Sequence, residues 1–142
     1  MIELGLADPP LGIPPEAGFL AALLTTVGFL IGAAITGRRR RIGAHARFVL
    51  AAVASLGVAI WFALALGELY DLEAAGDITP IHLGLARATT AVYLWPLLTG
   101  PLAYKGLIPS GVHRTGAWLA LVMTVAATVT GVMMLLGAER LP

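Results

Sequence analysis

The chain contains no cysteine, only three histidines, and charged side chains at just 12% of its 142 positions. The absence of cysteine excludes disulfide bonds, c-type haem attachment, iron–sulfur clusters and thiolate metal sites. With 58% hydrophobic residues, the chain is too apolar for a soluble domain of this length. His-Glu-x-x-His, Walker A and Gly-x-Ser-x-Gly motifs are also missing, so no residue set indicates hydrolysis or phosphoryl transfer.

Four long apolar runs account for this composition. A helix needs roughly 20 apolar residues to cross a hydrocarbon core of ~30 Å, and each run is long enough. The sequence predicts one membrane domain over residues 1–142, an all-α, four-helix up-down-up-down transmembrane bundle, with no repeat beyond this pattern. The predicted spans are about residues 17–36, 45–68, 81–104 and 113–136. We expect the proline-rich residues 1–16, which have no basic side chain, to form a short extended arm rather than a signal peptide.

Charged residues are divided between the two sides of this predicted bundle. Seven of the nine basic residues fall in two connections, and all eight acids fall on the other side. The positive-inside rule therefore predicts that both basic connections are cytoplasmic, with both termini and the 67–80 loop outside a bacterial inner membrane. The run Arg38–Arg41 sets this topology and contacts anionic headgroups of the lipid bilayer. No nucleic-acid role is expected, because no domain surrounds the run.

Each histidine lies at the start of a different predicted span. His45 and His113 open spans two and four, which lie diagonally across an up-down bundle, and both are at the cytoplasmic end. Two imidazoles in this arrangement can ligate one b-type haem, and Arg47 and Arg114 lie beside them for the propionates. The alternative is that both histidines are helix-end residues wetted by water and headgroups.

Small residues and prolines mark three of the spans. After His113, small residues follow at helical spacing: Gly116, Ala120, Thr124, Ala127 and Gly131. A small face lets another helix or a flat cofactor approach closely, and the pair Gly28 and Gly32 predicts helix packing in span one. Pro96 and Pro101 interrupt span three, where a proline removes a backbone hydrogen bond and kinks the helix.

The outer end and the third span hold further candidates. His82 with Glu68 or other acids of the outer loop is a candidate copper site, although one histidine makes a weak one. The alternative is an interfacial histidine at a helix end. Arg87 lies five residues inside span three, where a charge is costly. It either snorkels to the outer surface or pairs with Glu68, a propionate or a partner protein. Tyr93 and Trp95 predict a docking surface for a membrane partner.

Three stretches resemble the CtaM/YozB-like four-helix membrane family, a domain of unknown function (DUF420): RRRRIGAHARFV, IHLGLARATTAVYLWPLLTGPLAYKG and GVHRTGAW. The resemblance covers about residues 20–137, and His45, His82 and His113–Arg114 fall at the histidine positions of the family. It implies a role in maturation of haem–copper oxidases. Many members carry another histidine near the outer end of the second helix, where this chain has GELYDLE. If the family histidines form two ligand pairs, only His45 with His113 forms one here.

Three functions stay open at this point. The leading hypothesis is an accessory or assembly protein of a respiratory haem–copper oxidase, with b-type haem bound by His45 and His113. The second is a structural or electron-carrying subunit of a larger respiratory complex. The third is a copper-handling membrane protein. We expect a binding or assembly role with a membrane protein partner rather than an enzyme, because no self-sufficient catalytic set is present.

Overall fold

The computed structural model describes residues 12–141 as an all-α chain with one pair of two-residue strands. Three long apolar helices have the length and composition to cross a membrane: α1 (Pro15–Arg38), α2 (Ile42–Leu69) and α5 (Ser110–Gly137). They indicate an integral membrane protein. Most of the predicted N-terminal arm lies outside the described residues, and its last two residues already belong to α1.

The third predicted span is two consecutive helices rather than one. α3 (Ile78–Val92) and α4 (Leu94–Tyr104) are separated only by Tyr93, so the chain has four helices when this pair is counted as one broken helix. The break precedes Pro96, which has no N–H to donate to the Val92 carbonyl. Pro101, in contrast, lies inside α4 without ending it. The predicted interruption of this span is confirmed, about one turn before the proline that causes it.

The described chain divides into two compact units. One unit extends to Ala75 and also includes the chain from Leu135 onward, and the other is Gly76–Met134. The first contains α1, α2 and the strands, and the second contains α3, α4 and most of α5. We name α1 with α2 the N-terminal hairpin, and α3 and α4 with α5 the C-terminal hairpin.

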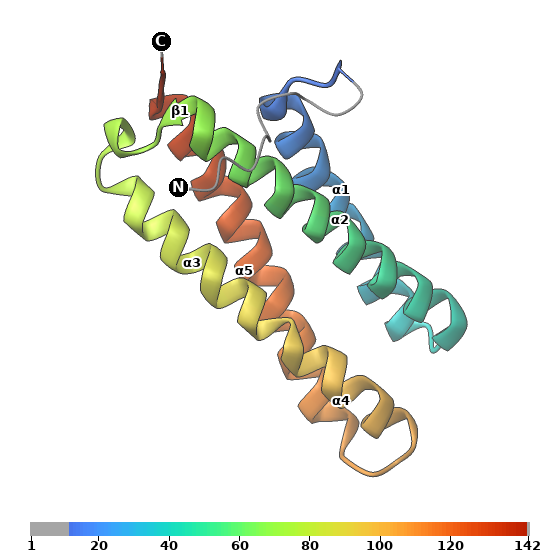
Figure 1. The fold of residues 1–142 in the computed structure, drawn as a ribbon. Helices are drawn as coiled ribbons and strands as arrows, with labels where there is room; N and C mark the ends of the chain where they lie inside the picture. Colours follow the sequence, from blue (N-terminus) through green and yellow to red (C-terminus); the bar gives the residue numbers. More distant parts are fainter. Residues whose placement is uncertain (1–11, 142) are drawn as a thin grey trace. The chain divides into compact units, whose positions relative to one another are not determined.

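In the N-terminal hairpin, α1 and α2 lie antiparallel and side by side (Figure 1). Their core consists of Phe19, Ala22, Leu23, Ala59, Phe62 and Leu66. The Phe62 ring occupies the space that a side chain at Gly18 would need, so the two helices approach closely there. Gly32 receives the Phe48 ring in the same way, whereas Gly28 is exposed to open space. Of the predicted glycine pair, only Gly32 packs against another helix, and Gly18 is the second close approach.

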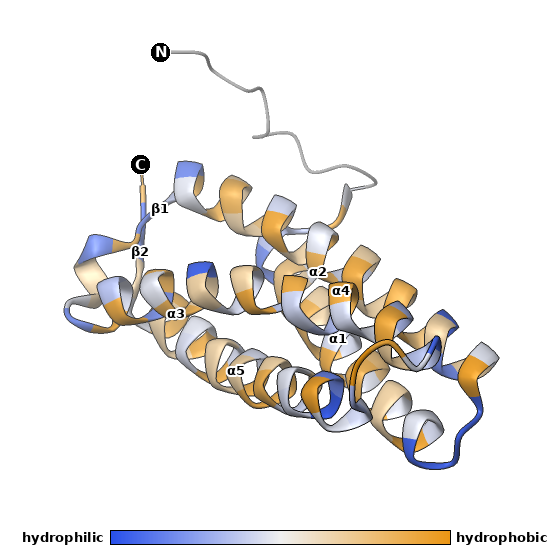
Figure 2. Cartoon of the chain, turned by 90° about the horizontal axis from the view of Figure 1, so that it is seen from below, coloured by the Kyte–Doolittle hydropathy of each residue, from blue (hydrophilic) through white to orange (hydrophobic). Residues whose placement is uncertain are grey.

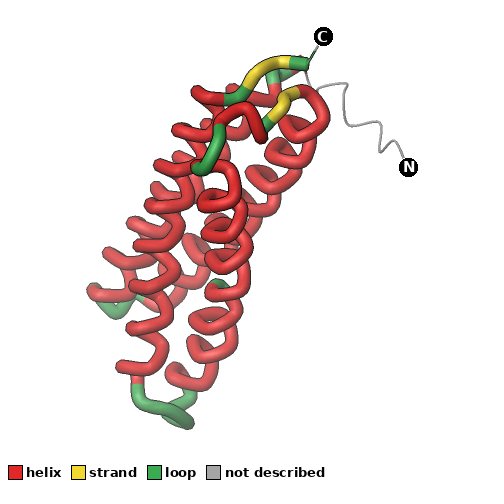
Figure 3. The backbone as a smooth tube through the Cα atoms, turned by 90° about the vertical axis from the view of Figure 1, so that its left-hand side faces the viewer, coloured by secondary structure: helices red, strands yellow, loops and turns green. Residues whose placement is uncertain are grey.

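A strand pair closes one end of the first unit. β1 (Tyr70–Asp71) pairs antiparallel with β2 (Glu139–Arg140), as the two short strands in Figure 3 show. The Tyr70 hydroxyl donates a hydrogen bond of 2.5 Å to the carboxylate of Glu16, in the first turn of α1. This bond raises the pKa of Tyr70, because an ionised phenol could not donate to a carboxylate. The β1–β2 pair and the Tyr70–Glu16 hydrogen bond together join three segments that are far apart in the sequence.

The outward faces of the long helices are apolar. Figure 2 shows hydrophobic colours along the bodies of α1, α2 and α5. Large aliphatic side chains point outward, with Leu50 of α2 69% exposed and Val122 of α5 61% exposed. Such a surface is unfavourable in water and suits contact with lipid chains.

Candidate functional site

His45 opens the second helix of the N-terminal hairpin, and its ring leans on the first helix. Its Nδ1 atom lies 2.8 Å from the Ala33 carbonyl oxygen. Because a carbonyl only accepts, Nδ1 carries a proton and is the donor. Gly37 makes room for the ring, since a β-carbon there would lie 3.1 Å from Nδ1. A backbone carbonyl that holds one ring nitrogen is a common means of orienting a metal-binding imidazole.

His113 occupies the corresponding place in the C-terminal hairpin. Its ring leans on α4, where a β-carbon at Gly100 would lie 3.3 Å from the Cε1 atom of His113. Its Nδ1 atom lies 3.5 Å from Oγ1 of Thr99, whose own proton goes to the Trp95 carbonyl at 2.7 Å. The threonine oxygen is therefore the acceptor for Nδ1–H. At 3.5 Å this bond is weaker than that of His45.

The two histidine niches, each a ring against a glycine of the preceding helix, follow one sequence pattern. A Thr-Gly dipeptide precedes the histidine in both hairpins, at residues 36–37 and 99–100. Buried residues then recur at seven-residue intervals after each histidine: Ala52, Ala59 and Leu66 in α2, and Ala120, Ala127 and Met134 in α5. No repeat was expected from the sequence, because the connection between glycine and histidine is five residues longer in the second hairpin and hides the alignment.

One turn from each histidine niche, an aromatic ring packs against a glycine at equivalent positions of the two hairpins. The helix that carries the ring and the helix that carries the glycine are exchanged between them. Three residues after each histidine stand Phe48 and Gly116, and five residues before each niche glycine stand Gly32 and Trp95. In the N-terminal hairpin, the second helix supplies the ring and Phe48 fills the space at Gly32. In the C-terminal hairpin, the first helix supplies the ring, and a β-carbon at Gly116 would lie 2.6 Å from Cδ1 of Trp95.

The small-residue face predicted on the fourth span is buried and serves helix packing. Trp95 covers Gly116, and the Tyr93 hydroxyl lies 3.0 Å from Oγ1 of Thr124. Thr124 in turn donates to the Ala120 carbonyl at 2.7 Å, so Tyr93 is the donor to Thr124. Of the two aromatic residues expected to form a docking surface, Tyr93 is only 6% exposed, whereas Trp95 is 41% exposed.

The outer candidates fall in different units. His82 is buried, and its Nδ1 atom lies 3.1 Å from Oγ1 of Thr130, so it links α3 to α5. Thr130 donates its proton to the Ala126 carbonyl, which makes His82 the donor to Thr130. Glu68 is exposed on α2 of the first unit, and Arg87 is exposed on α3 rather than buried within the chain. Within residues 12–141, no group of three or more histidine and acidic side chains could hold a metal ion.

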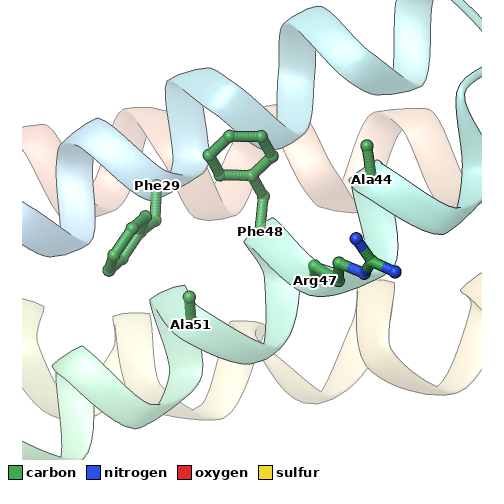
Figure 4. Close-up of a pocket in the computed structure, with 5 residues that line it drawn as sticks. All are labelled: Phe29, Ala44, Arg47, Phe48 and Ala51. Atoms are coloured by element: carbon green, nitrogen blue, oxygen red, sulfur yellow. The ribbon is translucent and has the colours of Figure 1, made fainter.

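Arg47 borders an open apolar pocket on the N-terminal hairpin (Figure 4). Phe29 of α1 and Ala44, Phe48 and Ala51 of α2 supply the rest of the lining, around a volume of about 330 Å³. The two phenylalanine rings are 6.3 Å apart and tilted by 51°. An apolar lining with one cation at its border suits a ligand that has an apolar body and an anionic end. Arg114, the other predicted cation, is exposed near the start of α5.

Both hairpins leave their first helix through the same turn. A residue with left-handed backbone ends the helix in each case, Arg40 with φ 54° after α1 and Gly106 with φ 71° after α4. The hydrogen bonds match: Arg40 N to Gly37 O and Arg41 N to Thr36 O, against Gly106 N to Ala103 O and Leu107 N to Leu102 O. This is the Schellman ending, in which glycine is favoured because a β-carbon strains the left-handed backbone. Arg40 thus stands at a position that glycine fits better.

Comparison with known proteins adds no relative: no protein-family model, no curated protein and no solved structure matches this chain. The family resemblance therefore rests on its short motifs alone.

Proposed function

We propose that this chain is an accessory or assembly protein of a respiratory haem–copper oxidase in the bacterial inner membrane, and that it binds b-type haem through His45 and His113. The observation that carries the proposal is the repeated histidine niche. Each half of the chain presents one imidazole at the start of its second helix, with Nδ1 engaged by the preceding helix. The three apolar helices support the membrane location, and the resemblance supports the link to an oxidase.

The donor chemistry of the niches fits b-type haem. A neutral imidazole with Nδ1 protonated can offer Nε2 to iron, and both histidines lie near the starts of helices. Arg47 and Arg114, exposed beside the histidines, suit the propionates. A bound haem would supply one-electron redox chemistry. The residues of the chain would orient the two rings and fix the position of their protons.

We further propose four membrane crossings with both termini outside. Pairing of β1 with β2 requires residues 71 and 139 to be on one side of the membrane. If α5 crosses once, α3 and α4 together must cross as well. They contain 15 and 11 residues, about 40 Å of helix with Tyr93 at 1.5 Å per residue, which is enough. A periplasm-active reporter fused after Pro142 should be active, and an inactive reporter on inserted protein would contradict this topology.

A reduced-minus-oxidised optical spectrum of the purified full chain tests the haem proposal. We expect a b-type band that is lost in both His45→Ala and His113→Ala. His82→Gln is the matched control, because it removes the third imidazole and retains a donor for Thr130, and it should keep the band. A spectrum without haem, or a band that survives both alanine variants, would contradict the proposal.

The link to an oxidase has a separate test. Deleting the gene should lower oxidase activity and haem content in membranes, and the tagged protein should recover a respiratory subunit in mild detergent. Stoichiometric recovery would favour the alternative of a permanent structural or electron-carrying subunit. Unchanged oxidase activity with no respiratory subunit recovered would refute both. A copper-handling role has less support, because the Nδ1 atom of His82 is hydrogen-bonded to Thr130.

A further inference from the structure

We infer that the pocket on the N-terminal hairpin is a binding site for an anionic phospholipid, with an acyl chain against Phe29, Phe48 and Ala51 and the phosphate against Arg47. The pocket belongs to one unit and is formed by α1 and α2 alone. It lies on helices whose apolar outward faces suit a lipid environment. The site goes beyond the proposed haem ligation, since neither histidine lines it. The two proposals share Arg47, however, so a lipid phosphate here would compete with a haem propionate for that side chain.

The apolar part of the pocket is held in shape by the helices. Phe48 is fixed because its ring fills the space at Gly32, where a β-carbon would lie 2.6 Å from Cε1 of the ring. The Phe29 ring of α1 lies beside the Phe48 ring, and the small side chains of Ala44 and Ala51 leave space between them (Figure 4). A rigid, shallow and open apolar groove suits a flexible acyl chain, which needs contact area rather than specific hydrogen bonds.

The charged part lies near the start of α2. Arg47 is five residues into α2 from Ile42, about 8 Å along the helix axis. The run Arg38–Arg41 lies at the same end, between α1 and α2, and all five side chains are exposed. Basic pockets between transmembrane helices on the cytoplasmic side are typical sites for anionic lipid headgroups. The charge complementarity therefore selects an anionic over a zwitterionic lipid.

The backbone conformation of Arg40 independently supports a role of the Arg38–Arg41 run in lipid binding. Arg40 adopts φ 54° in a turn where the other hairpin has Gly106 in the same conformation. Strained backbone is frequent at ligand-binding sites, where the surrounding structure maintains it. Replacing Arg40 by glycine removes a charge and relieves the backbone, so lipid binding and stability should change in opposite directions.

Native mass spectrometry of the purified full chain tests the site, with phosphatidylglycerol and phosphatidylcholine of identical acyl chains as probes. The wild type should bind phosphatidylglycerol more tightly. Arg47→Gln should weaken that binding about fivefold, the equivalent of ~1 kcal/mol for one charge near an anionic headgroup. Arg140→Gln, the same change at the β1–β2 end, should have no effect. Ala51→Phe should weaken binding of both lipids by filling the groove.

Arg40→Gly separates lipid binding from folding. It should weaken phosphatidylglycerol binding while the melting temperature stays equal or rises. Equal wild-type affinity for the two lipids, or equal losses in Arg47→Gln and Arg140→Gln, would overturn the proposal. Loss of a haem band in Ala51→Phe with phosphatidylglycerol binding intact would also overturn it, by assigning the pocket to haem. The histidine variants report on haem alone, so the two proposals can fail separately.

Discussion

The two hairpins share one pattern but differ in the partners of the side-chain hydrogen bonds that join their helices. In the N-terminal hairpin, aromatic rings fit against glycines, Phe62 at Gly18 and Phe48 at Gly32. In the C-terminal hairpin, only Trp95 makes such a fit. Its helices are also joined by hydrogen bonds between two side chains: His82 with Thr130, Tyr93 with Thr124, and Thr99 with His113. In the N-terminal hairpin, by contrast, the side chains of His45 and Ser55 bond to backbone carbonyls of α1.

The break in the third helix coincides with one of these bonds. α3 and α4 each have a side-chain hydrogen bond to α5, and Tyr93 is bonded at the break itself. Lipid provides little hydrophobic drive for helix association, so packing and hydrogen bonds must supply it. Both hairpins combine the two on the same pattern of buried positions.

The largest expected effect on stability comes from exchanging the aromatic residue and the glycine of the Trp95–Gly116 contact. Gly116→Phe should destabilise the chain by about 3 kcal/mol, because the new ring meets Trp95 in a closely packed contact. The double variant Trp95→Gly with Gly116→Phe recreates the order of the N-terminal hairpin and should recover much of the loss. Unfolding in mixed micelles with increasing sodium dodecyl sulfate measures both.

Gly28→Phe is the matched control for that exchange. The space around Gly28 is open, so the same substitution should have little effect on the unfolding free energy. A double variant no more stable than Gly116→Phe alone would show that the two contacts are not equivalent.

Loss of one polar bond should have a smaller effect. Thr130→Val removes the threonine acceptor of buried His82, while the backbone of Ala127 stays within its reach, and should cost about 1 kcal/mol in the same assay. Thr90→Val is the control, because exposed Thr90 donates only to its own helix. Adding His82→Leu to Thr130→Val should cost less than the sum of the two single changes. Equal effects of Thr130→Val and Thr90→Val would mean that the bond to His82 contributes nothing.

The smallest effect is a pH dependence confined to the first unit. The hydrogen bond to Glu16 raises the pKa of Tyr70, so the neutral phenol is favoured more in the folded state than in the unfolded state. The contribution of this hydrogen bond to the free energy of unfolding is fully present below the ordinary tyrosine pKa near 10. It is lost as pH rises through the higher pKa of Tyr70 in the folded state. Melting temperatures of the wild type should therefore fall more steeply above about pH 10 than those of Tyr70→Phe. Parallel curves for the two proteins would contradict this.

Several features could be predicted from local sequence because they depend on one segment at a time. Long apolar runs predicted α1, α2 and α5, since a helix that spans lipid must satisfy its own backbone. Pro96 predicted the interrupted third span, because a missing N–H acts on its own helix. The spacing of small residues after His113 predicted a buried face on α5.

The sequence by itself therefore determined which segments are helical and apolar, where one of them breaks, and which face of α5 is buried. Only the tertiary structure decided how these faces are used. It showed that Gly18 rather than Gly28 receives a ring, that Tyr93 bonds inward, and that both niche histidines lean on glycines of the preceding helix. These contacts join residues on different helices. The two hairpins share the spacing of these residues, but their connections between glycine and histidine differ in length, so the sequence alone does not reveal it. Apolar patterning identifies a buried face, but the shape of the facing helix decides which side chain fills it.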